Sequence, residues 1–300
     1  MDKIEAAALT SSLLSDYDAT DPRRTAAALR KAWLQAAPAQ TIPLAPGQQA
    51  FVRDWGIAET GFEAVGTPVP VLTAMGTEVG RLARKRTLEL LPLIRLLWDE
   101  FGREGRLVAV VALGPVELAA PETVVPVLHE MARTCVFWED CDQLAMKALE
   151  PVLRRDPGTW LDRLGAWVTD ENKWVRRAAL TAIGRLPMKQ ATYTRRCVDL
   201  LGPALGDPDS DVKRALSFAL RLCARGDTEP VQQFVLAHQD VHDAHSLWVL
   251  CDVLRSMTKT LLPRFAGLLP IYRAWLDTAE PLAQRSVEAT VRLLEGLAVR

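Results

Sequence analysis

Two stretches of the sequence repeat one pattern: Asp170-Glu-Asn-Lys-Trp-Val175-Arg-Arg-Ala178 and Asp207-Pro-Asp-Ser-Asp-Val212-Lys-Arg-Ala215. They are 37 residues apart, and each places acidic or amide residues before a Val-basic-Arg-Ala run. Such residues favour the start of a helix, and small alanines let neighbouring helices approach closely. A weaker match at the same offset joins Leu107–Leu113 to Leu144–Leu149. The pattern predicts a helical unit that recurs about every 40 residues.

The rest of the chain supports this reading. Apolar residues recur at three- and four-residue spacing almost everywhere, whereas the alternation typical of strands is nearly absent. Prolines and acidic caps interrupt the pattern every 12–20 residues, at Asp21-Pro22, Pro43, Pro68, Pro121, Asp156-Pro157, Asp207-Pro208 and Pro270. A helical repeat of this length is typical of HEAT and armadillo units. We predict an all-α fold, a right-handed superhelical solenoid of HEAT-like repeats whose concave face binds an extended partner.

The length and composition fit one repeat domain over residues 1–300, in which residues 241–300 form about three additional C-terminal helices. No apolar run reaches the roughly 18 residues that a membrane span needs, and the N-terminus does not resemble a secretory signal. The five cysteines are odd in number and contain no Cys-x-x-Cys pair, so we expect reduced, buried thiols and no zinc site. These features predict a cytoplasmic protein of the bacterial cytosol or nucleoid, with its oligomeric state open.

Charge is distributed unevenly along the chain. The net charge is −1, but residues 143–225 contain fifteen lysines and arginines against nine acidic residues. That segment therefore carries +6, and the remainder carries −7. A basic segment in a neutral chain is typical of contacts with DNA phosphates. An ordinary solvated helix surface is the alternative that charge alone leaves open.

Three short stretches combine aromatic, acidic and basic side chains. In the first, Trp138 and Asp142 are four residues apart, so that a helix places them on one face. In the second, Trp174, Arg177 and Arg185 share one stripe of a helix, and we expect the basic pair at 176–177 to point outward. The core positions of that helix are then Val175, Ala178, Ala179, Ala182, Ile183 and Leu186.

In the third stretch, an aromatic residue lies among cations: Phe218 shares a face with Arg214, Arg221 and Arg225. Successive repeats thus offer one acid, several aromatic rings and several arginines. If these repeats stack as predicted, the side chains share one surface.

These stretches resemble the AlkD-like DNA alkylation repair family. Its members carry a Trp-x-x-x-Asp motif, then a Trp-x-x-Arg-Ala-Ala helix, then an aromatic residue beside a Leu-Arg pair, and all three occur here in that order. The upstream segment Trp55–Pro68 looks like the family's Phe-x-Gly-Val-x-x-Pro signature. The resemblance covers about residues 50–240. Two departures are Phe218, where the family tends to have Trp, and the lack of an arginine soon after Pro68.

The resemblance implies a DNA glycosylase that hydrolyses the N-glycosidic bond of cationic alkylpurines, such as 3-methyladenine and 7-methylguanine, in duplex DNA. It implies base excision repair without metal or cofactor. Asp142 would be the catalytic carboxylate, and Trp138 and Phe218 would be aromatic walls. The implied DNA-binding residues are Arg177 and Arg185 at the phosphates, together with Trp174, Arg176, Arg214 and Arg221. The resemblance further implies that the damaged base need not enter a deep pocket.

Each motif also has a plain structural interpretation. Asp142 would then be a solvated acid, and Trp138 and Trp174 would belong to the core. Asp140 is a second acid near Trp138, but it lies about 200° around the helix from Asp142, and we expect it to face away. Six other tryptophans are predicted core residues: Trp33, Trp98, Trp160, Trp167, Trp248 and Trp275.

Three histidines, His238, His242 and His245, lie near Asp240 and Asp243. Their spacing could suit a metal, but the segment reads better as a polar loop at a helix start. The alternative function is a non-enzymatic HEAT module that binds DNA or protein on its concave face.

Overall fold

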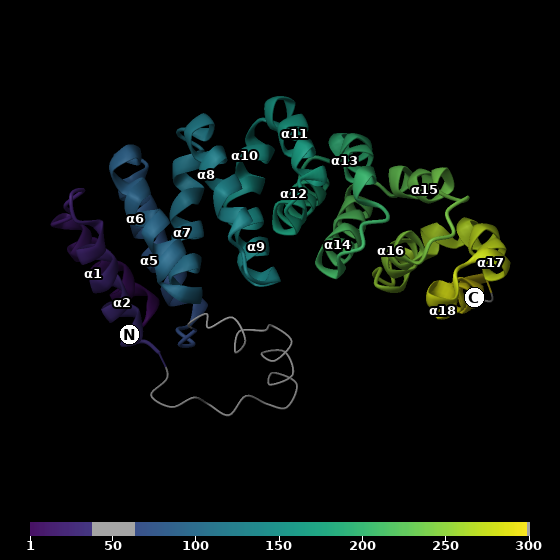
Figure 1. The fold of residues 1–300 in the computed structure, drawn as a ribbon, viewed down its shortest axis with the longest axis horizontal. Coiled ribbons are helices and arrows are strands. Elements are labelled where there is room, and N and C mark those ends of the chain that lie inside the picture. Colours follow the sequence, from purple (N-terminus) through teal and green to yellow (C-terminus); the bar gives the residue numbers. More distant parts are fainter. Residues whose placement is uncertain (38–63, 299–300) are drawn as a thin grey trace. The chain divides into compact units, whose positions relative to one another are not determined.

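The computed structural model describes residues 1–37 and 64–298, and every regular element in these two ranges is a helix (Figure 1). The all-α prediction is therefore confirmed. No helix in the same ranges combines the length and the apolar character that a bilayer span requires. Pro43 and the first part of the Trp55–Pro68 segment lie outside the described residues.

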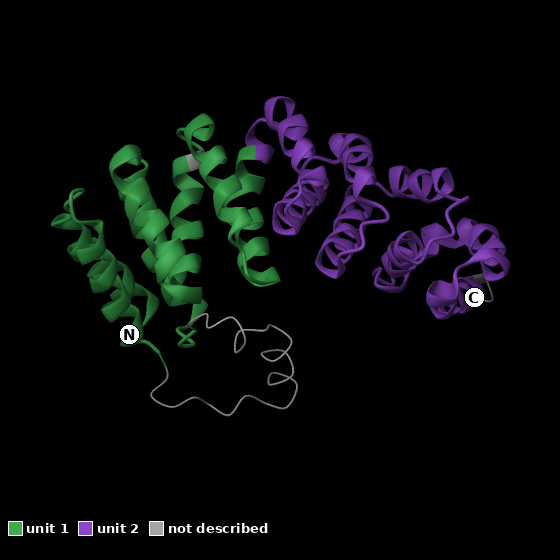
Figure 2. Cartoon of the chain, in the orientation of Figure 1, with its two compact units in different colours: residues 1–152 green, residues 153–300 purple. Residues whose placement is uncertain are grey.

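The chain divides into two compact units, residues Met1–Val152 and Leu153–Arg300 (Figure 2). Each unit has its own buried core. The boundary falls within α10 (Glu150–Arg155), and therefore within the range for which the sequence predicts one repeat domain. That prediction of a single domain stays a prediction.

Unit 1 is built from helices that alternate between two layers. α5 packs against α1 and α7, and α6 packs against α2 and α7. α9 and the π-helical turn that follows it pack on α7. The helices are α1 (Lys3–Ser15), α2 (Pro22–Leu34), α5 (Val69–Ala83), α6 (Thr87–Glu100), α7 (Gly102–Glu117), α8 (Pro121–Arg133) and α9 (Trp138–Leu144).

Unit 2 shows the same alternation more regularly. α12, α14, α16 and α18 each pack against the next in one layer, while α11, α13 and α15 do so in the other (Figure 1). The helices are α11 (Pro157–Gly165), α12 (Lys173–Arg185), α13 (Thr194–Leu201), α14 (Ser210–Gly226), α15 (Thr228–Ala237), α16 (Ala244–Arg255), α17 (Leu269–Thr278) and α18 (Pro281–Ala298). Short 3₁₀ turns join several of them, and the longest is Leu262–Leu268.

The repeated sequence pattern corresponds to a repeated helix cap. The Asn172 side chain accepts hydrogen bonds from the N–H groups of Trp174 and Val175, at 2.9 and 3.4 Å. The Asp209 carboxylate accepts the same two bonds at the start of α14, at 2.8 and 3.4 Å. Because these caps satisfy backbone donors that a helix start leaves open, they fix where α12 and α14 begin.

The start of α14 corrects one sequence prediction. Asp207-Pro208 was predicted as the cap, whereas α14 begins at Ser210 and Asp209 caps it. Asp207 instead accepts a hydrogen bond from the Asp209 N–H, at 2.8 Å. The other cap predictions hold where a proline is the first helical residue, as at Pro22, Pro121 and Pro157.

α12 and α14 approach each other closely at Gly184. A Cβ atom added there would lie 2.5 Å from both the Cα and the Cβ of Ala219, which is too close for any carbon pair. The six core positions predicted for this stretch are all fully buried, five of them in α12 and the sixth, Leu186, directly after it. The small-residue pattern that predicted close helix packing is therefore confirmed for this pair.

The predicted core tryptophans divide into two groups. Trp33, Trp98, Trp160 and Trp275 are buried as expected. Trp167 and Trp248 are only half-buried. All five cysteines are free thiols with buried side chains, namely Cys135, Cys141, Cys197, Cys223 and Cys251. Burial raises the pKa of Cys197 to about 12, so this thiol stays protonated at neutral pH.

Candidate functional site

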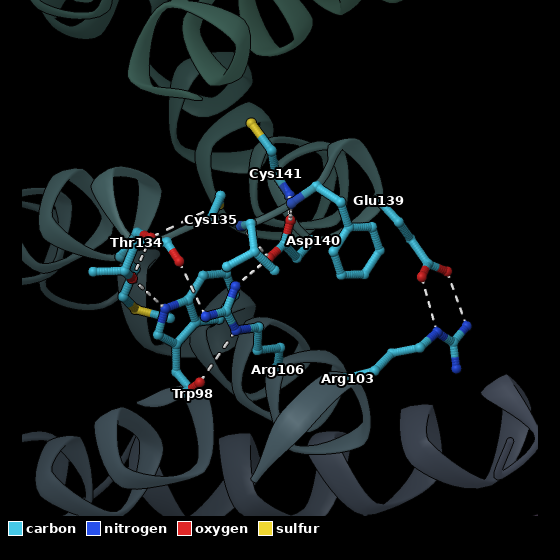
Figure 3. Close-up of polar contacts among 11 residues, drawn as sticks. Trp98, Arg103, Arg106, Thr134, Cys135, Glu139, Asp140 and Cys141 are labelled. Carbon is cyan, nitrogen blue, oxygen red and sulfur yellow. Dashed lines mark hydrogen bonds and ion pairs between the residues drawn. The ribbon is translucent and has the colours of Figure 1, made fainter. Parts of the chain in front are cut away.

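The turn before α9 is held in place by a buried arginine of α7 (Figure 3). The Arg106 guanidinium forms an ion pair with the Asp140 carboxylate. Arg106 also donates hydrogen bonds to two main-chain oxygens, those of Trp98 at 3.3 Å and Thr134 at 3.0 Å. Its guanidinium carbon lies 4.5 Å from the centre of the Trp98 ring. One side chain thus ties α7, the end of α6 and the turn after α8 together.

Asp140 completes this cluster from the other side. Its carboxylate accepts hydrogen bonds from the N–H groups of Val136 and Phe137, at 3.2 and 3.3 Å, and so caps the start of α9. Only 4% of its surface is exposed. Burial raises the pKa of Asp140, while the Arg106 charge and the backbone donors oppose that shift. This buried position agrees with the prediction that the Asp140 side chain faces away from Trp138.

A second ion pair lies beside the first. Arg103 of α7 donates from Nε and Nη2 to the two oxygens of Glu139, at 2.8 and 2.9 Å, in a paired fork geometry (Figure 3). Glu139 and Asp140 are adjacent residues in the first turn of α9. The first turn of this helix is therefore anchored to α7 by two arginines.

Trp138 and Asp142 lie on the helix that these ion pairs anchor. Trp138 is the first residue of α9, and Asp142 follows one turn later. Both side chains are half-buried, so that neither is sealed inside the core. Both residues therefore lie on one helix, four positions apart, as the sequence predicts, and their roles stay a prediction.

The helix changes its hydrogen-bond register shortly after Asp142. Residues Ala145–Leu149 form a π-helical turn, in which the Glu150 N–H bonds to the Ala145 carbonyl. π turns inside α-helices are rare and occur frequently at functional sites. The sequence gives no signal for this turn, because its composition is that of an ordinary helix.

On α12, the two adjacent arginines are held by protein groups. Arg176 pairs with Asp207, with 2.7 Å between Nε and Oδ2, and donates to the Asp170 and Glu171 carbonyls. Arg177 is only 7% exposed and donates to the Asp211 carbonyl at 2.8 Å. The prediction that both point outward is wrong for Arg177, because its side chain is buried and donates to a main-chain carbonyl of α14.

The remaining side chains of α12 are more accessible. Trp174 is half-buried, and the Lys173 ammonium lies 4.4 Å from its ring centre. Lys173 also bonds to Asp211 at 2.9 Å, so this cation is shared between a ring and a carboxylate. Arg185, at the end of α12, is half-buried.

α14 presents an exposed aromatic ring beside a fixed cation. Phe218 is 36% exposed, and the Arg221 guanidinium lies 5.7 Å from its ring centre. Arg221 is held by Asp252 of α16, with 3.4 Å between Nη1 and Oδ2. Burial lowers the pKa of Arg221, although the guanidinium stays charged at neutral pH. Arg214 is exposed on the same helix.

The histidine segment has the loop character that the sequence predicted. Asp243 caps α16 by accepting from the N–H groups of His245 and Ser246. His238 packs on the Phe234 ring, and the His245 Nδ1 lies 3.1 Å from the Lys213 ammonium. Within residues 1–37 and 64–298, no cluster of His, Cys, Asp or Glu is arranged to hold a metal.

The ion pair of Arg106 and Asp140 that anchors α9 was not predicted from the sequence. Arg106 and Asp140 are 34 residues apart, and neither belongs to a repeated motif. The one available signal was the position of Asp140, three residues after the last non-helical residue, where an acid can cap the helix.

The sequence matches a known protein family. A family model described as "DNA alkylation repair enzyme" matches residues 40–248, which are 209 of the 300 residues. No curated protein and no solved structure matches. The matched range includes Trp138, Asp142, Trp174 and Phe218, the residues on which the resemblance was based. The family supports a role in DNA repair, and the chain belongs to the AlkD-like DNA alkylation repair enzyme family.

Proposed function

We propose that this protein is a DNA glycosylase that hydrolyses the N-glycosidic bond of cationic alkylated purines in duplex DNA. One observation carries the proposal: a half-buried indole and a half-buried carboxylate, Trp138 and Asp142, lie one turn apart on α9 in a member of a DNA repair family. Both groups are reachable from solvent, as a site for a macromolecular substrate requires.

The chemistry needs few protein groups. Alkylation at N3 or N7 of a purine places a positive charge on the base, which makes the base a good leaving group. When the bond between C1′ and the base nitrogen breaks, its electron pair neutralises the departing base, and positive charge develops on the sugar. A carboxylate about 3 Å away stabilises that charge or orients the water that adds to C1′. Asp142 takes this role in the proposal.

In this proposal, the aromatic rings and the arginines contact different parts of the DNA. The electron-rich faces of Trp138 and Phe218 attract a cationic base or sugar, with about 0.5–2 kcal/mol for each ring. Phosphate contacts position the duplex and carry no sequence information. Among the predicted phosphate ligands, the exposed Arg214 and the half-buried Arg185 are more available to DNA than the arginine pair at 176–177. Both arginines of that pair are bonded to protein groups.

We further propose that the helices form HEAT-like repeats in a right-handed solenoid, as the sequence pattern indicates. Two observations support this. The caps of α12 and α14 repeat at an offset of 37 residues, and the helices of unit 2 alternate between two layers. HEAT-like stacks of this kind bind extended partners along one face, which suits duplex DNA.

The experiment that tests the activity measures release of 7-methylguanine and 3-methyladenine from methylated duplex DNA. We expect release by the wild type and a loss of at least about 100-fold for Asp142→Asn, the order of magnitude for removing one transition-state contact. The matched control is Asp277→Asn on α17, an exposed acid outside the family match. This control should release the bases at the wild-type rate.

Two outcomes count against the proposal at different levels. If the wild type releases no base, the chain is a binding module and the enzyme assignment fails. If Asp142→Asn is as active as the wild type, a different group supplies the carboxylate function. Circular dichroism of each variant shows that a loss of activity does not come from unfolding.

A further inference from the structure

The first turn of α7 carries three charged side chains, and they bond to different segments of unit 1. Its sequence is Gly102-Arg-Glu-Gly-Arg106. Arg103 and Arg106 pair with acids in the first turn of α9. Glu104, which lies between them in the sequence, is only 1% exposed and takes no part in the proposed chemistry. A carboxylate that is buried this deeply needs bonded partners, because the loss of its hydration is costly.

Glu104 bonds to the backbone of the short segment that precedes α5. Its Oε1 atom accepts hydrogen bonds from the N–H groups of Val65 and Gly66, at 3.2 and 3.0 Å. Gly66 has a φ of +80°, a left-handed conformation that favours glycine. The next residue, Thr67, is also buried, and its hydroxyl donates to the Trp33 carbonyl at 3.1 Å. This segment is therefore fixed to both α7 and α2.

The same carboxylate also contacts the arginine that holds Glu139. The Glu104 Oε1 atom lies 3.9 Å from Nη1 of Arg103. The other two nitrogens of that guanidinium, Nε and Nη2, bond to the two Glu139 oxygens (Figure 3). The guanidinium is planar and rigid, so an acid on each side of it leaves little freedom to rotate. The Arg103 and Glu139 side chains are only 15% and 14% exposed, so solvent screens their contact weakly. Glu139 directly follows Trp138 in α9.

We propose that Glu104 is a positioning residue for Trp138. It joins the segment before α5 to the first turn of α9 through the Arg103 guanidinium, without touching the substrate. Without this carboxylate, the N–H groups of Val65 and Gly66 lose their acceptor, and Arg103 loses one of the two acids that hold it. The first turn of α9 is then less firmly held, and the Trp138 ring moves. The catalytic use of that ring rests on the proposed function, whereas its position does not.

The test follows the Trp138 ring by fluorine NMR of the full chain labelled with 5-fluorotryptophan. Trp138→Phe identifies the Trp138 resonance among those of the nine tryptophans. We expect Glu104→Ala to shift or broaden this resonance by more than its wild-type linewidth. Glu104→Gln should leave it in place, because the amide oxygen still accepts from both N–H groups. The resonances of Trp160 and Trp275, which are buried in unit 2, serve as internal references.

The matched control is Glu78→Ala in the same unit. The Glu78 carboxylate joins two helices, since it accepts from Ser11 of α1 and pairs with Arg81 of α5, and its loss should leave the Trp138 resonance in place. If Glu104→Ala does not fold, Arg103→Met takes its part, because it keeps a long apolar side chain and cannot pair with Glu139. The proposal is overturned if the Trp138 resonance does not respond, or if Glu78→Ala moves it equally.

Activity gives a second readout that fails separately. Under the proposed function, Glu104→Ala should lower kcat for 7-methylguanine release by about tenfold or more and change KM by less than about threefold, because a misplaced group slows the reaction more than it weakens DNA binding. A wild type that releases no base, but whose Trp138 resonance moves in Glu104→Ala, keeps the positioning role and loses the glycosylase. An active wild type whose Trp138 resonance and kcat are unchanged in Glu104→Ala keeps its activity and loses the positioning role.

Discussion

The N-termini of α9 and α14 are both capped by an aspartate, but the two carboxylates differ in burial and in their ion-pair partners. At α14, the side chain of Asp209 caps the helix by accepting from N–H groups two and three residues ahead of itself, and its ion pair with Lys173, at 3.5 Å, is partly exposed. At α9, Asp140 also accepts from nearby backbone N–H groups, but its charge is balanced by Arg106 of α7, which lies 34 residues earlier in the sequence. Asp209 is half-buried, whereas Asp140 is nearly sealed from solvent.

The cap at α14 belongs to the repeated sequence pattern, since Asn172 caps α12 in the same way, whereas the Arg106–Asp140 ion pair does not belong to it. A local cap contributes about 1 kcal/mol, and a partly exposed ion pair such as that of Lys173 with Asp209 adds at most about 1 kcal/mol. A buried ion pair makes each partner depend on the other, because a lone buried charge is costly. α9 carries the Trp138–Asp142 pair, so the cluster in Figure 3 holds the helix on which the proposed chemistry depends.

Removing Arg106, the ion-pair partner of Asp140, should have the largest effect on the free energy of unfolding. We expect Arg106→Leu to lower the free energy of unfolding by about 3–5 kcal/mol, since it leaves Asp140 charged and unpaired in the core. Urea unfolding followed by circular dichroism measures this. The double variant Arg106→Leu/Asp140→Asn should recover part of the loss, because an amide carries no charge. A single-variant loss below about 1 kcal/mol would contradict the asymmetry between the two helix starts.

The contact between α12 and α14 should give the next largest effect. Gly184→Ala places a Cβ against the Ala219 backbone, and we expect it to cost about 1–3 kcal/mol through overpacking. Gly296→Ala on α18 is the control, because nothing lies within 4 Å of its added Cβ. That change should stabilise the protein by up to about 1 kcal/mol, as alanine favours a helix. Equal stabilities for the two variants would show that the helices adjust freely.

The local cap at α14 should respond more weakly. We expect Asp209→Ala to cost about 1 kcal/mol, because it leaves two N–H groups without their acceptor. Asp209→Asn should be nearly neutral, since an amide oxygen caps as well, and Asn172 plays this part at α12. Unfolding curves of the three proteins give the comparison. If Asn were as destabilising as Ala, charge rather than capping would explain the role of Asp209.

The smallest expected effect concerns the exposed ring. Phe218→Trp should change the free energy of unfolding by less than about 0.5 kcal/mol, because the side chain lies at the surface. Under the proposed function, the larger indole should raise the rate of 7-methylguanine release by about two- to threefold, because Trp attracts cations best. Phe218→Ala should lower that rate. Identical rates for Phe, Trp and Ala would remove the ring from the proposed site.

Local patterns in the sequence were enough to predict the helices, several of their caps and the core of α12. Each of these depends on residues within one or two turns, where the spacing of apolar and capping residues determines the outcome. The placement of Trp138 and Asp142 on one helix belongs to this class. So does the loop at Asp243, which caps α16.

Only the tertiary structure decided which charges are exposed. Arg177 belongs to an ordinary basic pair in the sequence, yet it is buried and donates to the Asp211 carbonyl of α14. Arg106 and Asp140 form an ion pair across 34 residues, and no local pattern links them. The physical reason is that burial of a charge depends on partners contributed by neighbouring helices. Periodicity identifies the buried face of a helix, but it does not identify the groups that meet a charge there.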